Sequence, residues 1–283
     1  MVPSDLTTSL RFNAYLFTLF MISVYSLISS SYSGDPVSDT SARELCMKIT
    51  MLVFQGRSTR PMRIQAKGNG IYDRRFEQLP RRNVTIDSVF SSYKYFQHVE
   101  EELRTDLTFK PRILDEARQW LEEQTPEKWK GKEFVRVVIH VRRTDHISRA
   151  RVNDGSPVPT AEYFNRSMTY FTDCLDRVQF VVLSDDSTWC MKHITADDVV
   201  YSNSSRHFSI VDIVYSSGHT PIVDMAIASL CDHAIMTVGT YGWWAAWFAN
   251  GITITQRNLP RNGSTLSRRL YRSDHYKPEW IGL

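Results

Sequence analysis

The chain of 283 residues has little excess charge, and this shortage excludes one class of partner. Its formal net charge is only +3, and its basic residues are spread along the chain apart from small clusters such as Arg81-Arg82 and Arg268-Arg269. We therefore expect no nucleic-acid partner. Internal repeats and low-complexity tracts are also lacking, so a repeat architecture is not expected. The length allows one large domain or two small ones with a substantial core.

Cysteines are few as well, and their spacing does not resemble a zinc site. The four residues are Cys46, Cys174, Cys190 and Cys231. In an oxidising compartment they could form two disulfides, and three pairings are possible. Cys190 and Cys231 lie inside hydrophobic segments, where buried free thiols are an equally good interpretation.

Charge is absent from residues 12–34, and most of this segment is apolar. A membrane-spanning helix needs about 20 such residues. We predict a cytosolic tail over residues 1–11 and a transmembrane signal anchor over residues 12–34, with the rest of the chain lumenal because Arg11 stays on the cytosolic side. A cleaved signal peptide ending near Ser31–Ser33 is the main alternative, and a buried core helix is the third.

Four Asn-x-Ser/Thr sequons agree with a lumenal location. They predict N-glycosylation at Asn83, Asn165, Asn203 and Asn262. Each sequon alone is weak evidence, because sequons also arise by chance.

The chain changes character along its length. Residues 35–60 are polar and are predicted to be a stem, and residues 61–110 show no long period. From Pro111 onward, strands and helices alternate. We predict helices starting at Pro111 and after an N-cap at Thr160, helices over Pro221–Cys231 and Tyr241–Phe248, and strands over Phe134–Val141, Gln179–Leu183, His233–Val238 and Ile252–Thr255. This alternation predicts an α/β domain with a parallel sheet, whose ligands bind at the carboxyl ends of the strands.

The first predicted strand ends in the run HVRRTDH, which begins at His140. Arg142 and Arg143 suit a phosphate ligand, because the planar guanidinium donates two parallel hydrogen bonds. With His140 they could form a cradle for a diphosphate. Asp145 could orient one guanidinium or accept a hydrogen bond from a sugar hydroxyl. A surface loop with an Arg–Asp ion pair is an equal alternative.

The second predicted strand stops at Ser184-Asp185-Asp186. The simpler interpretation is that Ser184 or Asp185 caps the next helix. The functional interpretation is that Ser184 and Asp185 line a nucleotide crevice. Two adjacent carboxylates beside a phosphate would suggest Mg²⁺, but no third ligand stands at a fixed spacing from them.

A glycine-bearing turn, Gly239-Thr240-Tyr241-Gly242, joins a predicted strand to a predicted helix. Free N–H groups and the positive end of the helix dipole make such a turn a potential anion site. Thr240 adds a hydroxyl group. The tryptophans that follow fit a core better than a sugar-binding platform.

Together these segments resemble the α1,2-fucosyltransferase family, glycosyltransferase family 11, in its nematode-type members. The matching motifs are His140-x-Arg142-Arg143-x-Asp145, Phe180-x-x-x-Ser184-Asp185-Asp186-x-x-Trp189-Cys190, Asp224-x-Ala226 with Cys231, and Ile235-Met236-Thr237-x-Gly239-Thr240-Tyr241-Gly242-x-Trp244-Ala245-Ala246. The chain also ends in Tyr276-x-Pro278-x-Trp280-x-Gly282, which is similar to the family's C-terminal signature. The motifs stand in the family's order over residues 134–283.

The resemblance implies a GT-B-like fold with two Rossmann-like halves. Residues 131–283 would bind GDP-fucose, and residues 61–130 would form a shortened, acceptor-side half. The implied activity is that of a galactoside 2-α-L-fucosyltransferase, which transfers fucose with inversion from GDP-fucose to the 2-hydroxyl of a galactose-containing glycan. No metal or other cofactor is implied, which removes the Mg²⁺ interpretation. The implied location is the Golgi membrane, as a single-pass type II protein bound to the bilayer by its N-terminal helix.

The resemblance also implies roles for single residues. Arg142 and Asp145 would be catalytic, and the GDP-fucose ligands would be His140, Arg142, Arg143, Ser184, Asp185, Gly239, Thr240, Tyr241 and Gly242. One family motif, Gly-x-Leu-Gly-Asn, is not matched; the nearest stretch, Lys67-Gly68-Asn69-Gly70, does not align with it. The alternative function is therefore an inactive, fucosyltransferase-like lumenal protein that binds GDP-fucose without transfer.

Overall fold

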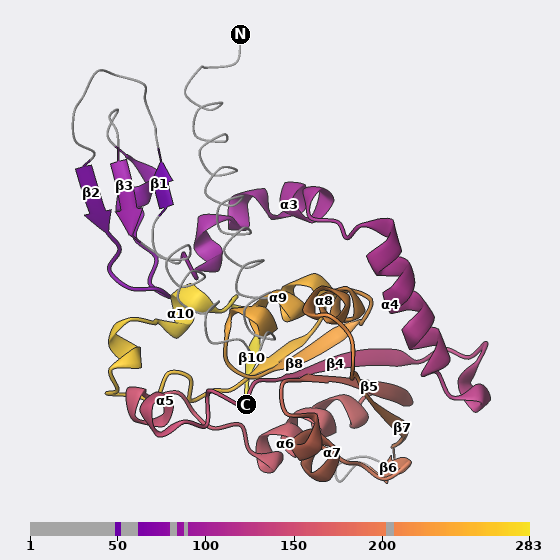
Figure 1. The fold of residues 1–283 in the computed structure, drawn as a ribbon. Helices are drawn as coiled ribbons and strands as arrows, with labels where there is room; N and C mark the ends of the chain where they lie inside the picture. The colour runs from indigo at the N-terminus through magenta and orange to yellow at the C-terminus, as the bar shows by residue number, and fades with distance from the viewer. Residues whose placement is uncertain (1–48, 52–61, 80–83, 88–89, 202–206) are drawn as a thin grey trace. The chain divides into compact units, whose positions relative to one another are not determined.

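The computed structural model describes residues 49–51, 62–79, 84–87, 90–201 and 207–283 (Figure 1). The predicted tail, signal anchor and nearly all of the stem lie outside the described residues, as do Cys46, Asn83 and Asn203. Among the residues that are described, no helix has both the length and the apolar character needed to cross a bilayer.

The chain divides into two compact units. Of the described residues, the first contains those up to Leu107 together with Thr265–Lys277, and the second contains those within Thr108–Ser264 together with Pro278–Leu283. Helix α4 (Pro111–Glu123) belongs to the second unit because it packs against helix α8 (Pro221–Ser229). The boundary at residue 130 between an acceptor-side half and a nucleotide-binding half stays a prediction.

The first unit contains a three-stranded sheet in the order β1-β3-β2. Strand β3 (Val84–Asp87) pairs antiparallel with β1 (Ile49–Met51) and parallel with β2 (Met62–Gln65). The helices of this unit are α3 (Glu100–Asp106), α10 (Arg272–His275) and single 3-10 turns at Arg74–Glu77, Tyr93–Tyr95, Gln97–Val99 and Leu266–Arg268.

The segment 265–277 packs in the first unit against residues around Gly70 and Lys94. The Gly70 N–H donates to the Arg269 carbonyl oxygen at 3.0 Å, and the Asp274 carboxylate accepts from Lys94 Nζ at 2.6 Å. A Cβ added at Gly68 would lie 2.7 Å from the Arg269 carbonyl oxygen. The glycines of the stretch that does not align with the family motif therefore allow close backbone contact with this returning segment.

The second unit contains a seven-stranded sheet in the order β10-β9-β8-β4-β5-β7-β6. Neighbouring strands are parallel, except for the antiparallel edge pair β6–β7. After α4 and a 3-10 turn at Glu127–Trp129, its elements are β4 (Val135–Val141), α5 (Arg149–Asp154), α6 (Ala161–Thr172), β5 (Arg177–Ser184), α7 (Ser187–His193), β6 (Val199–Tyr201), β7 (Phe208–Tyr215), α8, β8 (His233–Met236), α9 (Thr240–Ala249), β9 (Thr253–Thr255) and β10 (Ile281–Gly282). The predicted α/β class with a parallel sheet is confirmed, and its six parallel strands fit a Rossmann-like half of a GT-B fold.

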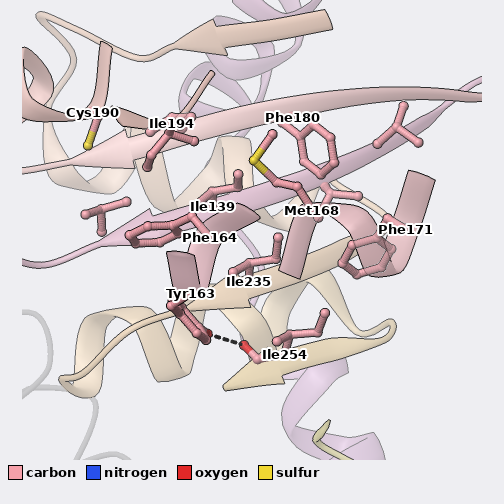
Figure 2. Packing of buried hydrophobic residues seen from close by; sticks show 14 of the residues in the cluster. Ile139, Tyr163, Phe164, Met168, Phe171, Phe180, Cys190, Ile194, Ile235 and Ile254 are labelled. Atoms are coloured by element: carbon pink, nitrogen blue, oxygen red, sulfur yellow. Dashed lines mark hydrogen bonds between the residues drawn. The ribbon is translucent and has the colours of Figure 1, made fainter. Parts of the chain in front are cut away.

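Helix α6 covers one face of this sheet (Figure 2). Thr160 caps the helix as predicted, because its hydroxyl accepts a hydrogen bond from the Tyr163 N–H at 3.3 Å. Phe164 and Phe171 are buried against alternate side chains of β4 and β5. Each such side chain contributes about 1.5–3 kcal/mol of burial free energy. The Tyr163 hydroxyl donates to the Met236 carbonyl oxygen at 2.7 Å, which ties α6 to β8.

Helices α8 and α9 lie on the other face of the sheet (Figure 1). From β4 the chain runs outward through β5 to β7 and then returns to β8 on the opposite side of β4. The strand order therefore reverses between β4 and β8. In open parallel sheets this switch point leaves a crevice at the carboxyl ends of the strands, where ligands bind.

The C-terminal signature completes the edge of this sheet. The Leu283 N–H donates to the Thr255 carbonyl oxygen at 2.9 Å, and β10 pairs with β9. Trp280 packs on Trp243 of α9 with 5.1 Å between the ring centroids. These contacts give the signature a structural role in supporting α9.

The cysteines favour free thiols over disulfides. Cys174, Cys190 and Cys231, which are the cysteines that the structure describes, are not paired with one another. Cys190 and Cys231 are buried, which confirms the free-thiol interpretation for these two residues.

Candidate functional site

The three motif-bearing segments meet at the carboxyl edge of the second unit's sheet. Arg142 follows β4, and its N–H donates to Thr237 Oγ1 after β8 at 2.9 Å. The next residue, Arg143, donates its N–H to Asp185 Oδ1 after β5 at 2.9 Å. The loop after β4 is thus held from both neighbouring strands, at the switch point where a ligand is expected.

Arg142 presents half of its guanidinium to this edge. Its Nε donates to Asp145 Oδ1 at 2.7 Å and lies 3.4 Å from Asp185 Oδ2. Neither terminal nitrogen has a partner within the described part of the chain, and 23% of the side chain is exposed. The Arg–Asp ion pair of the simpler interpretation is therefore present, and it orients a guanidinium whose two terminal N–H₂ groups remain available for an oxyanion.

Asp145 acts on Arg142 in this geometry. Partial burial tends to raise the pKa of Asp145, but the charge of Arg142 outweighs it and the pKa is lowered overall. The carboxylate is therefore ionised at neutral pH and paired with Nε. Of the two roles predicted for Asp145, the geometry favours orientation of Arg142.

Arg143 has different surroundings from Arg142. Its guanidinium carbon lies 3.8 Å from the centroid of the Trp189 ring, and Nη1 donates to the Pro159 carbonyl oxygen at 3.1 Å. Nε approaches Asp186 Oδ2 at 3.4 Å, and only 12% of the side chain is exposed. Two of its three guanidinium nitrogens have partners within the protein, and the contact with Trp189 links Arg143 to α7. Contact of Arg143 with a diphosphate stays a prediction.

Asp185 holds the loop after β4. Besides the Arg143 N–H, it accepts from the Thr144 N–H at 3.3 Å and from Thr144 Oγ1 at 2.5 Å. The helix cap that we predicted at Ser184 or Asp185 is wrong. Asp186 caps α7 by accepting from the Trp189 N–H at 3.1 Å, because β5 extends to Ser184 and the helix begins at Ser187.

Ser184 serves the same turn. Its hydroxyl oxygen accepts a hydrogen bond from the Asp186 N–H at 2.9 Å. Ser184 and Asp185 are thus brought to the predicted edge, with their oxygens already bonded to protein donors. Direct contact of either residue with a nucleotide stays a prediction.

His140 is buried near the carboxyl end of β4. Burial lowers the pKa of its imidazole to about 3, so the ring is neutral at physiological pH. Its Nδ1 has no hydrogen-bond partner among the described residues. The ring lies against Tyr241, with 5.4 Å between the centroids. A Cβ at Gly242 would lie only 2.3 Å from Nδ1, so this glycine makes room for the imidazole.

The N-terminus of α9 is the second positive element of the edge. Gly239 precedes the helix with φ of 99°, a conformation that favours glycine, and the helix has no side-chain cap. Its first N–H groups are therefore not satisfied by a capping side chain. Tyr241 fixes this turn, since its hydroxyl donates to the Pro221 carbonyl oxygen at 2.7 Å. The helix begins at Thr240, one residue before the predicted start at Tyr241.

Asp224 is a buried carboxylate that we did not name as a candidate site residue, although it belongs to one of the matching motifs. It lies in the first turn of α8 and is 6% exposed. Burial raises the pKa of Asp224 to about 6, while the hydrogen bond from Ser216 Oγ at 2.6 Å opposes the shift. Its signal in the sequence is a single carboxylate within the apolar run of a buried helix.

Replacing Asp224 with asparagine is expected to stabilise the protein above pH 6. Because the folded-state pKa is raised, the carboxyl is protonated below about pH 4 and does not lower the free energy of unfolding there. As the pH rises through 6 the folded protein is progressively destabilised, because the carboxyl must ionise in a buried place. The full penalty is up to about 3 kcal/mol. The free energy of unfolding, measured in urea, should increase more in the variant at pH 8 than at pH 4.5.

Asp197→Asn is the matched control, because it removes the same charge from an exposed side chain. It should leave the free energy of unfolding unchanged at both pH values. An Asp224→Asn effect that is the same at both pH values would contradict the proposed burial penalty.

No group of three or more potential metal ligands occurs among the described residues. Asp185 and Asp186 are both bonded to the protein, as described above. The expectation that no metal takes part stays a prediction.

The model of "Glycosyl transferase family 11" matches residues 5–283. Galactoside alpha-(1,2)-fucosyltransferase 1 of Sus scrofa is 28% identical over 194 residues, which are 68% of this chain and 50% of the relative. The proteins of the same name in Ateles belzebuth and Oryctolagus cuniculus are also 28% identical over 194 residues, which cover 50% and 49% of their lengths. The matched part is thus about half the length of these curated relatives.

Proposed function

This chain belongs to glycosyltransferase family 11, and from that premise we propose that it is a galactoside 2-α-L-fucosyltransferase. It would transfer fucose from GDP-fucose to the 2-hydroxyl of a galactose-containing glycan. The family membership and the relatives' names support the reaction class. The observation that carries the proposal is Arg142, with its Nε fixed by Asp145 and its terminal nitrogens available, at the switch point of the sheet.

The arrangement suits departure of a nucleoside diphosphate. In the proposed reaction the bond between fucose C1 and the β-phosphate oxygen breaks, and its electron pair goes to GDP. The acceptor oxygen bonds to C1 from the opposite face, with inversion, and loses its proton. Arg142 and the uncapped first turn of α9 would stabilise the negative charge that grows on GDP. Because these donors are held by the fold, they need little rearrangement during reaction.

The neutral His140 fits the same scheme. A charged imidazole near the carboxyl end of β4 would need solvation that burial denies it, and its pKa of about 3 keeps it uncharged. The ring then supports the Tyr241-Gly242 turn without competing for an anion. The nitrogen Nδ1 is close to Gly242, so the first turn of α9 and the end of β4 are packed as one surface.

The experiment that tests the proposal uses the full chain with GDP-fucose and a panel of β-galactosides. We expect GDP release that depends on the acceptor, and a product in which NMR identifies an α1,2 linkage. Release of GDP with no dependence on acceptor, or no release from a folded protein that binds GDP, would contradict transfer.

The alternative is a family member that binds GDP-fucose without transferring it. It is favoured by the unmatched Gly/Asn motif, whose nearest stretch contacts residues 269 and 270 in the first unit. Calorimetry separates the two functions, since a binder would take up GDP with no turnover for any acceptor. The nematode-type subgroup stays a prediction as well.

We also propose the Golgi membrane as the location, with residues 12–34 as the anchor of a type II protein. The uncharged apolar run supports this placement. Alkaline extraction of membranes from expressing cells would leave an anchored chain in the pellet, whereas a chain with a cleaved signal peptide would be released.

Glycosylation is expected at Asn165 and Asn262, which are both exposed. Asn165→Gln and Asn262→Gln should each increase electrophoretic mobility by one glycan when the chain is expressed in secretory cells. The control is Asn258→Gln, an exposed asparagine outside any sequon. Unchanged mobility of both sequon variants, or a difference that persists after enzymatic removal of N-glycans, would contradict the prediction.

A further inference from the structure

A cavity of about 420 Å³ opens at the amino end of β4. Its apolar wall is formed by Leu121, Trp129, Phe134 and Leu230. Arg136, at the start of β4, also lines it, whereas Arg142 follows the end of the same strand. Six residues of strand span about 20 Å. The cavity therefore belongs to the opposite edge of the sheet from the candidate functional site.

Arg136 is a half-buried cation in this cavity, and it has no ion-pair partner among the described residues. Its Nε donates to Gln179 Oε1 at 3.0 Å and its Nη2 to Thr125 Oγ1 at 2.8 Å, and both acceptors are neutral. Nη1 has no partner in the described part of the chain. The nearby Asp232 carboxylate accepts from the backbone N–H of Arg136, at 2.8 Å, instead of from its guanidinium.

The position of the guanidinium is fixed before any ligand arrives. Its central carbon lies 4.6 Å from the centroid of the Phe134 ring, and the two hydrogen bonds above hold its plane. Burial lowers the pKa of Arg136, and the nearby Cys231 and Asp232 oppose this shift without cancelling it. A positive charge in such a place is costly unless an anion compensates it.

The other charged residues around the cavity do not supply that anion. Arg118 and Lys130 add two cations, and they are paired with exposed carboxylates outside the lining, Asp115 at 3.4 Å and Glu127 at 2.7 Å. Glu122 is the single carboxylate of the lining, and it is exposed. Three cations and one carboxylate leave the lining positive.

We propose that this cavity binds a small organic anion, with a phosphate or carboxylate group on Arg136 and an apolar body against Trp129 and Leu230. The charged group accepts hydrogen bonds from Nη1, and charge-assisted bonds of this kind are the strong ones. The apolar body replaces water on the side chains of the wall. The site is independent of fucose transfer, because it shares no residue with the carboxyl edge.

The test is a calorimetric titration of the full chain with phenyl phosphate, benzoate and inorganic phosphate. We expect phenyl phosphate or benzoate to bind with a stoichiometry of one, more tightly than inorganic phosphate, which lacks the apolar body. Preference for one of the two aromatic probes identifies the acid group. Equal binding of all three probes would overturn the apolar part of the proposal, and no binding would overturn the site.

Variants test whether the probe binds in the cavity at the amino end of β4. Arg136→Gln keeps a side chain that can bond Thr125 and should weaken binding of the aromatic anion by about tenfold or more. Leu230→Trp fills the cavity without removing the guanidinium and should also block binding; circular dichroism confirms that each variant is folded. The matched control, Arg112→Gln, removes an exposed arginine outside the cavity lining and should bind the probe like the wild type. Loss of binding in Arg112→Gln with retention in both cavity variants would overturn the proposal.

Discussion

Replacing Arg142 with glutamine is expected to lower kcat/KM for the proposed fucosyl transfer by about 10²- to 10³-fold, because in the proposed reaction its guanidinium stabilises the charge that grows on GDP as the bond breaks. The free energy of unfolding should fall by no more than about 1 kcal/mol, since the ion pair with Asp145 is partly exposed. Initial rates with GDP-fucose and a β-galactoside, and urea denaturation, measure the two effects.

Two further variants sharpen this prediction. Arg142→Lys keeps the charge but loses the planar fork, so it should recover only part of the rate. Arg112→Gln removes an exposed arginine of α4 and should leave the rate unchanged. A wild-type rate in Arg142→Gln would show that this guanidinium does not act on the leaving group, and the proposed site would then be wrong.

Replacing Gly242 with alanine is expected to destabilise the second unit, even though alanine favours helices by about 1 kcal/mol. The new methyl group would lie 2.3 Å from Nδ1 of the buried His140, and that ring has no exposed space into which to turn. We expect a net loss of about 1–3 kcal/mol in the free energy of unfolding. Displacement of the first turn of α9 should also weaken GDP binding.

A double-mutant cycle isolates the contact. In a His140→Ala background the ring is gone, so Gly242→Ala should cost little or become favourable. The coupling energy between the two positions should be at least about 1 kcal/mol. Additive effects of the two substitutions would mean that the destabilisation comes from elsewhere in α9.

Many elements of the second unit could be predicted because their signals are local. The β-branched run of β4, the cap at Thr160 and the proline at the start of α4 each act within a few residues. Strand β7 was missed. It carries Asp212, whose carboxylate accepts from the buried Gln179 side chain at 2.9 Å. A polar residue within a strand is explained only by its partner on the neighbouring strand.

The two adjacent arginines show the same limit at the candidate site. Arg142 and Arg143 carry the same local signal, and the sequence predicted that both approach a diphosphate. Their contacts differ, because Arg143 packs on Trp189 of α7 and donates to the Pro159 carbonyl oxygen in the segment before α6. Arg142 meets Asp145 only through Nε.

By itself, the sequence determined the parallel α/β class, the carboxyl-edge location of the motifs and the resemblance to the family. Periodicity, capping and strand-end composition are local properties, so they can be read from neighbouring residues without knowledge of distant contacts. Only the tertiary structure decided that residues 265–277 join the first unit, that Asp185 holds the loop after β4, and that Asp224 is buried with a raised pKa. These outcomes depend on contacts between residues far apart in the chain, where packing and the loss of water determine hydrogen bonding and charge.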